Sequence, residues 1–247
     1  MGATTQAPRR SDLDGLRGLA IALVVVFHVF VGRVSGGVDV FLMLAGFFFL
    51  GSQVRYAGRP GALANPLWPL LRTIRRLVPS LVTVLAGSAL ILWLFAREWA
   101  SEVLTRQLRA ALLYVLNWEL IAQDADYAAA STAPSPLQHL WSMSVQGQFY
   151  LMAILVGSLC VAWPFFRRRL VGPLLIAATV ASFAWAARNG LHGDTDDYYS
   201  TWTRLWQMTL GGALAVYGLK LRLPTALAGA ASFTGVAMLV ATGFVIG

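Results

Sequence analysis

The chain has 247 residues, of which 57% are hydrophobic and only 12% are charged. A soluble domain carries roughly 45–50% apolar and about 25% charged residues, so this composition excludes a water-soluble globular protein. The formal net charge of +8 would suit a nucleic-acid-binding protein, but the basic residues lie in short clusters between apolar runs. We interpret their excess as positive-inside topology and as attraction to anionic lipid head groups.

Apolar runs near the length of a bilayer-spanning helix follow one another along the chain. They predict an all-α protein: a polytopic transmembrane helical bundle of about seven or eight membrane helices. We expect a single transmembrane domain over residues 1–247 and no soluble domain. The eight runs lie at about 16–32, 38–54, 77–96, 104–122, 145–166, 170–188, 202–219 and 225–246.

The charges between these runs predict the orientation of the chain in the membrane. Arg9 and Arg10 place the N-terminus in the cytoplasm. The segment 55–76 holds five arginines and no acidic residue, and is expected on the same side, as is the triplet at 167–169. The sequence therefore predicts a multi-pass protein of the cell membrane with a cytoplasmic N-terminus.

The run at 104–122 does not fit this alternation, because both of its ends are expected outside. It also carries Arg106, Arg109, Asn117 and Glu119, which are costly in lipid. The run is therefore either an interfacial or re-entrant helix, or a full span whose polar face lies inside the bundle.

Two ionisable residues in the first apolar run are the strongest functional signal. Arg17 and His28 are eleven residues apart, which is about three helical turns and about 16 Å along one face. Ionisable groups inside a membrane helix are functional candidates by default. The alternatives are that Arg17 reaches the head groups and that His28 bonds a neighbouring helix.

Asp39 follows the Gly36-Gly37 turn at the start of the second run. A hairpin of the first two helices can bring it to His28, and a carboxylate that fixes a histidine tautomer makes a general base. The alternative is that Asp39 caps the second helix.

Further motifs follow in order between about residues 12 and 215. They are Arg17-(ten residues)-His28, the Gly-rich run 36–47, Arg72-Thr-Ile-Arg75-Arg76-Leu-Val-Pro79, Asn117-Trp118, the block 139–150 (His-Leu-Trp-Ser-Met-Ser-Val-Gln-Gly-Gln-Phe-Tyr) and the stretch 203–212. Together they resemble the acyltransferase 3 family of integral membrane O-acyltransferases, in the form of an actinobacterial-type branch.

Three positions depart from the family pattern. Gln146, Gly147 and Gln207 stand where acidic residues are common, so no acidic catalytic role is transferred to them. Family members commonly have more membrane helices, and some have an external hydrolase-like domain. We therefore expect this chain to lack the last helices and any such domain.

The resemblance implies transfer of an acyl group, usually acetyl, from cytoplasmic acyl-CoA to a hydroxyl of an extracytoplasmic sugar or glycolipid of the cell envelope. Acyl-CoA is then a donor substrate, and no bound cofactor, metal or nucleic acid is expected; the remaining partners are the carbohydrate acceptor and membrane lipids. The alternative is a proton-coupled transporter or flippase of a lipid-linked or sugar substrate. A structural membrane scaffold is a second alternative.

On this reading His28 is the general base, with Arg17 and Asp39 beside it as catalytic residues. The i, i+3, i+4 spacing places Arg72, Arg75 and Arg76 on one helix face, where they would bind acyl-CoA phosphates. The alternative for these three is ordinary positive-inside anchoring.

The acceptor-binding candidates come from the block at 139–150. They are Trp141, Ser142, Gln148 and Tyr150. The alternatives are an aromatic belt for the tryptophan and hydrogen bonds within the bundle for the polar side chains. His139 in the same block is the rival general base.

Overall fold

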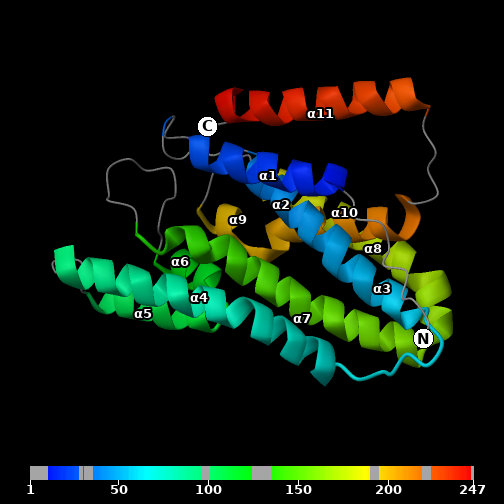
Figure 1. Ribbon diagram of the computed structural model, residues 1–247, viewed down its shortest axis with the longest axis horizontal. Coiled ribbons are helices and arrows are strands. Elements are labelled where there is room, and N and C mark those ends of the chain that lie inside the picture. The colour runs from blue at the N-terminus through cyan, green and yellow to red at the C-terminus, as the bar shows by residue number, and fades with distance from the viewer. Residues whose placement is uncertain are drawn as a thin grey trace, which may run out of the picture. The chain divides into compact units, whose positions relative to one another are not determined.

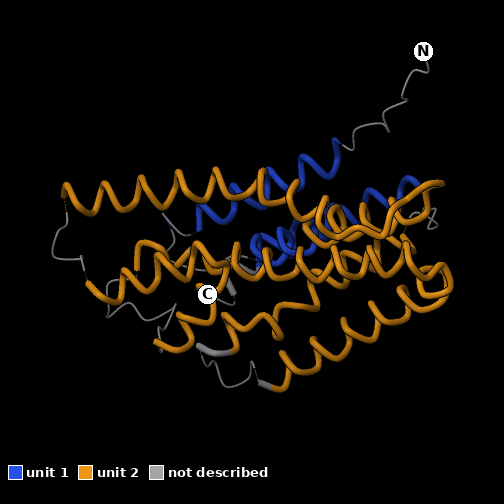
Figure 2. The backbone as a smooth tube through the Cα atoms, turned by 90° about the horizontal axis from the view of Figure 1, so that it is seen from below, with its two compact units in different colours: residues 1–44, 222–247 blue, residues 45–221 orange. Residues whose placement is uncertain are grey.

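The computed structural model describes residues 11–27, 30, 36–95, 101–123, 135–189, 195–218 and 224–245. Every regular element within these ranges is a helix, which confirms the all-α class (Figure 1). Contacts divide the chain into two units, which Figure 2 colours separately: unit 1 is 1–44 with 222–247, and unit 2 is 45–221.

Unit 1 holds helix α1 (Ser11–Val26), nearly all of α2 (Gly37–Ala45) and α11 (Thr225–Val245). Asp12 and Asp14 lie in the first turn of α1, where negative charge complements the helix dipole. The predicted first, second and last apolar runs each correspond to helix within the described ranges.

Four helices are long and apolar enough to cross a bilayer, among the residues that the structure describes. Large apolar side chains remain exposed along them, such as Ile91 at 60% and Val180 at 61%, as expected for surfaces that face lipid. The chain is thus a multi-pass membrane protein. The four spans are Gly37–Ala57, Leu67–Phe95, Gln138–Ala162 and Phe166–Arg188.

The first of these spans is continuous from α2 through a π-helical turn, η2 (Gly46–Leu50), into α3 (Gly51–Ala57). Within unit 2, Gly46 packs directly on the backbone of Met208. Only a residue without a side chain allows this approach, which is a common way for membrane helices to pack closely.

Helix α4 (Leu67–Phe95) begins earlier than the apolar run at 77–96 predicted. The Asn65 side chain accepts a hydrogen bond from the Leu67 amide (2.9 Å) and so caps the helix, directly before it starts. The first turns of α4 are rich in arginine, so a search for apolar runs does not include them in the helix. The helix therefore carries the arginines of 72–76 within its own length.

The run at 104–122 forms a helical hairpin rather than one rod. Helix α5 (Glu102–Leu112) and helix α6 (Leu116–Ala122) pack on each other. The Gln107 amide donates to Gln123 at 2.7 Å, so residues near the two ends of the run lie together. At 11 and 7 residues, neither helix has the roughly 20 residues that a span needs. This geometry favours the interfacial or re-entrant alternative.

The rest of unit 2 is built on two long helices and their partners. Helix α8 (Val171–Asn189) and helix α10 (Thr201–Tyr217) pack along each other, and the Thr179 hydroxyl donates to the Thr209 hydroxyl between them at 2.9 Å. The elements are η4 (Gln138–Leu140), α7 (Trp141–Ala162), η5 (Phe166–Leu170), α8 (Val171–Asn189), α9 (Thr195–Tyr199) and α10 (Thr201–Tyr217).

Candidate active site

The candidate catalytic residues of the first two helices belong to unit 1. His28 lies outside the described residues. The Arg17 guanidinium on α1 lies 5.9 Å from the ring centroid of Phe41 on α2, so it packs between these helices. Asp39 lies in the first turn of α2 and is half-buried, a position that suits both the capping and the catalytic interpretation.

The arginine face of α4 (Arg72, Arg75 and Arg76) is exposed. The Arg72 guanidinium lies 3.7 Å from the Trp68 ring centroid, a cation–π contact that orients it. No acidic side chain is recorded as an ion-pair partner of these three among the described residues. Three guanidinium groups on one helix face are thus open to an anionic ligand.

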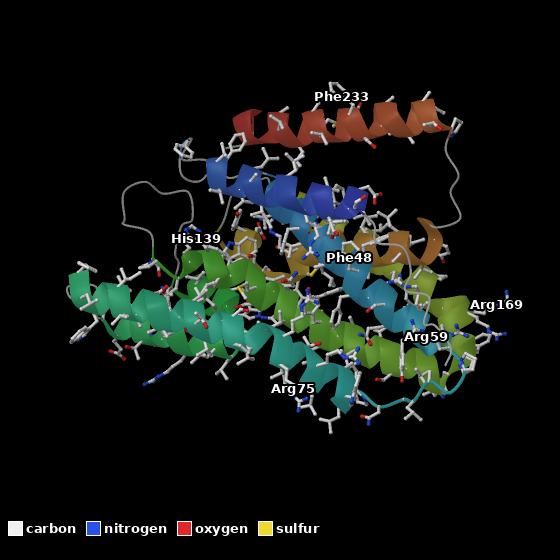
Figure 3. All side chains as sticks on the ribbon, viewed as in Figure 1. Phe48, Arg59, Arg75, His139, Arg169 and Phe233 are labelled. Carbon is white, nitrogen blue, oxygen red and sulfur yellow. The ribbon has the colours of Figure 1, made fainter. Side chains whose placement is uncertain are left out.

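More arginines gather at one end of unit 2. Figure 3 shows Arg59 and Arg169 at the same end. The contact of Gly58 with the Arg167 guanidinium joins the end of α3 to η5. The positive-inside rule expects residues 55–76 and 167–169 on one side of the membrane, and the structure brings the segments around Gly58 and Arg167 together.

The opposite end of α7 holds a hydrogen-bonded cluster centred on Gln148. Its amide nitrogen donates to the Tyr114 carbonyl (2.8 Å) and to Asn117 Oδ1 (2.9 Å). Its oxygen accepts from the Thr201 hydroxyl (2.6 Å) and the Trp118 indole (3.3 Å). Every hydrogen-bonding position of this amide is therefore used within the protein.

Asn117 is fully buried and completes the same cluster. Its amide nitrogen donates to the Tyr199 carbonyl (3.1 Å) and to Thr201 Oγ1 (3.0 Å). The cluster of Asn117, Gln148 and Thr201 thus ties α6, α7 and α10 together, as polar side chains often do in membrane bundles.

The other acceptor-binding candidates differ in how much of them a ligand can reach. Trp141 is 2% exposed and packs edge-on against Tyr198 and Tyr199. It therefore does not belong to a lipid-facing aromatic belt. Ser142 and Tyr150 are half-buried; the Tyr150 ring stacks on Phe49 at 4.0 Å between centroids, and the Ser142 hydroxyl lies 3.5 Å from the His139 carbonyl.

His139, the rival base, lies in η4 directly before α7 and is exposed (Figure 3). Within the described ranges no group of three or more His, Cys, Asp or Glu side chains could hold a metal ion.

Sequence reasoning missed Tyr114, the residue at the break of the α5–α6 hairpin. It adopts a left-handed conformation with φ of 57°, which is uncommon for a bulky residue. Its ring lies against Gly147, so that a Cβ added there would come within 2.9 Å of Tyr114 Cγ. The Tyr114 hydroxyl is buried and has no hydrogen-bond partner among the residues that the structure describes. Glycine at 147, a departure from the family pattern, was the available signal.

These features define a multi-pass membrane protein with a polar cluster inside its helices and an exposed arginine face. Residues 10–247 match the family described as an acyltransferase domain. The chain therefore belongs to this acyltransferase family, which confirms the resemblance found in its motifs.

Among curated proteins, the chain is similar to a provisionally named membrane-bound transacylase, BcsY, of Komagataeibacter xylinus. The two are 34% identical over 245 residues, which cover 95% of this chain and 58% of that protein. It is 29% identical over 212 residues to a provisionally named peptidoglycan O-acetyltransferase, YrhL, of Bacillus subtilis, covering 83% of this chain and 32% of that protein.

The O-acetyltransferase OatA of Staphylococcus aureus is 29% identical over 208 residues, which cover 82% of this chain and 34% of that protein. The chain thus spans between about a third and three fifths of the length of these relatives. No solved structure matches the chain.

Proposed function

We propose that the protein is an O-acyltransferase that moves an acyl group, acetyl in the first instance, from cytoplasmic acyl-CoA to a hydroxyl of an extracytoplasmic sugar or glycolipid. Membership of the acyltransferase family over residues 10–247 supports the reaction class. The observation that carries the choice of donor is the exposed arginine face of α4.

This face suits a polyphosphate ligand. Arginine binds phosphate oxygens through paired N–H donors, and a diphosphate can engage neighbouring guanidinium groups at once. Arg72 is held by Trp68, while Arg75 and Arg76 are exposed beside it. An acyl-CoA bound here would have its phosphates at the start of α4 and its acyl thioester directed into the bundle.

The reaction needs a general base near the thioester, and His28 is the proposed one. As the acceptor hydroxyl attacks the thioester carbonyl, a new C–O bond forms, the C–S bond breaks, and His28 takes the hydroxyl proton. The imidazolium then returns that proton to the leaving thiolate, which departs as the CoA thiol. General-base catalysis of this kind contributes typically 10²–10⁴-fold. In this scheme Asp39 orients the imidazole, and Arg17, on the same predicted helix as His28, is the third catalytic residue.

The acceptor would bind near the start of α7. Ser142 and Tyr150 are half-buried and remain the candidates for direct contact. Trp141 and Gln148 contact neighbouring protein groups, so we assign them a structural role in fixing the helices around the acceptor. Relatives named for O-acetylation, one of them for peptidoglycan, favour a carbohydrate acceptor.

The competing function is a proton-coupled transporter or flippase that uses His28 and Arg17 as a gate. It predicts movement of a sugar or lipid-linked substrate across the membrane with no acylated product. A purely structural scaffold predicts that loss of His28 affects assembly alone.

The test is transfer from labelled acetyl-CoA by purified protein, with sugar and glycolipid acceptors analysed by mass spectrometry. We expect His28→Ala to lower transfer at least 100-fold while the thermal unfolding temperature stays at the wild-type value. His139→Ala is the matched control and should keep its activity, because that histidine is exposed in η4 and is not the base in this mechanism. Full transfer by His28→Ala would contradict the mechanism.

A further inference from the structure

One end of unit 2 gathers positive charge that its own helices do not balance. Arg55, Arg59 and the triplet 167–169 lie in or directly after α3 and in η5, and Figure 3 shows Arg59 and Arg169 at this end. The helices that meet here, which are α3, α7, α8 and α10 with η5 between them, contain no Asp or Glu. A counter-charge for these five arginines must therefore come from outside these helices.

One face of α3 leaves room for guanidinium groups. Gly51, Arg55 and Gly58 are spaced i, i+4 and i+7, which places them on the same face of the helix. A Cβ added at Gly58 would lie 2.5 Å from Arg167 Nη1, and one added at Gly51 would lie 2.9 Å from Arg55 Nη1. The two glycines thus let two cationic groups lie directly on this helix face.

The turn that follows α3 is held by hydrogen bonds and keeps Arg59 beside Gly58. The Arg59 amide donates to the Tyr56 carbonyl at 2.9 Å, and the Leu63 amide donates to the Tyr56 hydroxyl at 3.2 Å. Arg55 lies one turn before Gly58 on the same face and is exposed, as is Arg59. Both side chains can therefore extend to a ligand held by the guanidinium that rests on Gly58.

That guanidinium belongs to Arg167, which reaches α3 from η5 and is half-buried. Its amide donates to the Trp163 carbonyl at 3.2 Å, so its backbone is held in the turn between α7 and α8. Within the described ranges no ion pair of this arginine is recorded. A half-buried cation without an anionic partner is costly, and a bound anion would offset that cost.

Exposed aromatic side chains place this cluster at the edge of the bilayer. Trp163 is 64% exposed and Phe165 is 69% exposed, directly before Arg167. Aromatic rings of this kind are typical of the head-group level of a membrane. The span Gly37–Ala57 ends here and the span Phe166–Arg188 begins here. At this level the available anions are the head groups of anionic lipids.

We propose that Arg167, together with Arg55 and Arg59, binds the phosphate of an anionic phospholipid. Guanidinium groups donate paired N–H bonds to phosphate oxygens, and the acyl chains of the lipid would lie against Trp163 and Phe165. Such a lipid joins the end of α3 to η5 through its head group. The site uses other residues than the arginine face of α4 and needs no acyl transfer, so the inference does not rest on the proposed function.

The test is the binding of phosphatidylglycerol to the detergent-purified protein, measured by native mass spectrometry during a lipid titration. We expect phosphatidylglycerol to bind about tenfold more tightly than phosphatidylcholine, whose head group has a phosphate but no net charge. Arg167→Gln should weaken the binding of phosphatidylglycerol about tenfold, because a charge-assisted hydrogen bond is lost. Its unfolding temperature without added lipid should match the wild-type value.

Three further variants separate geometry from charge. Gly58→Ala keeps every charge but puts a methyl group where Arg167 Nη1 lies, so it should also weaken the binding of phosphatidylglycerol. Gly87→Ala on α4 is its control, because nothing lies within 4 Å of the added Cβ. Arg188→Gln removes one exposed positive charge at the other end of α8. Both control variants should bind phosphatidylglycerol like the wild type.

Equal weakening by Arg167→Gln and Arg188→Gln would overturn the inference, because total charge alone would then govern binding. Equal affinity for the two lipids would overturn it as well. Displacement of phosphatidylglycerol by inorganic phosphate at constant ionic strength would also do so, and would make the cluster a site for a soluble anion. If Arg167→Gln does not fold, the double variant Arg55→Gln/Arg59→Gln, which changes two exposed residues, decides by the same measurement.

Discussion

The cluster around Gln148 and the arginine face of α4, both in unit 2, differ in whether the protein itself supplies their hydrogen-bond partners. Around Asn117 and Gln148 the protein supplies partners for each amide position of Gln148 and for the Asn117 nitrogen and oxygen. On α4, Arg75 and Arg76 are exposed, and their donors face lipid head groups, water or a ligand. Both regions belong to motifs that the family resemblance marked.

This difference separates residues that hold the bundle from residues that bind. A side chain whose hydrogen-bonding capacity is complete within the protein has little left to offer a ligand, and its loss should damage folding first. A side chain that the protein leaves open should affect binding first. Tyr114 lies in the first region, and its buried hydroxyl has no hydrogen-bond partner within the described ranges.

The largest effect should come from Asn117→Leu. The substitution leaves the Tyr199 carbonyl and the Thr201 and Gln148 side chains short of a partner at a site that is fully buried. Each unsatisfied buried group costs about 1–3 kcal/mol, so we expect a loss of roughly 3 kcal/mol in the free energy of unfolding. Thermal unfolding of the purified protein measures it.

Ser142→Ala is the control for that measurement, since the Ser142 hydroxyl lies at 3.5 Å from its carbonyl partner and is half-buried. Its unfolding temperature should stay near the wild-type value. If Asn117→Leu unfolds at that temperature as well, the cluster around Gln148 does not stabilise the bundle.

A smaller effect is expected on the arginine face of α4. The double variant Arg75→Gln/Arg76→Gln removes two phosphate donors and should raise the KM for acetyl-CoA about tenfold, which is about 1.4 kcal/mol of binding free energy. The unfolding temperature should not change, because the exposed guanidinium groups have no acidic partner recorded in the described part of the chain. Steady-state kinetics at constant ionic strength measure the shift.

Arg106→Gln is the matched control for those kinetics. Arg106 is 52% exposed and forms an ion pair with Glu119 at 3.4 Å, and an exposed pair of this kind contributes at most about 1 kcal/mol. Its loss should leave the KM for acetyl-CoA unchanged. An equal rise of KM in both variants would mean that overall positive charge, and not a phosphate site, attracts the donor.

The sequence was sufficient to predict an all-α membrane protein and to separate its apolar helices from its charged segments. Long apolar runs must become helices in lipid, since every backbone polar group needs an internal partner there. The charges around 104–122 predicted that both of its ends lie outside the membrane, which stays a prediction, and the hairpin joined by Gln107 and Gln123 is compatible with it.

The cluster around Gln148 could not be predicted in the same way. Asn117, Gln148 and Thr201 are far apart in the chain and meet only because α6, α7 and α10 pack together. Periodicity assigns a residue to a face but does not reveal its partner on another helix. Left-handed conformations are usually predicted from Gly, Asn or Asp, but this one falls on Tyr114. The one sequence feature related to it was the glycine at 147, where the family commonly has an acidic residue and where the Tyr114 ring packs.

The most direct test of the account places donor and acceptor on opposite sides of a membrane. Purified protein is reconstituted into vesicles with a sugar acceptor sealed inside, and labelled acetyl-CoA, which does not cross the bilayer, is added outside. We predict that labelled O-acetyl acceptor accumulates inside while CoA thiol appears outside, and that His28→Ala gives neither. Passage of unmodified sugar with no acetylated product would contradict the account and favour a transporter.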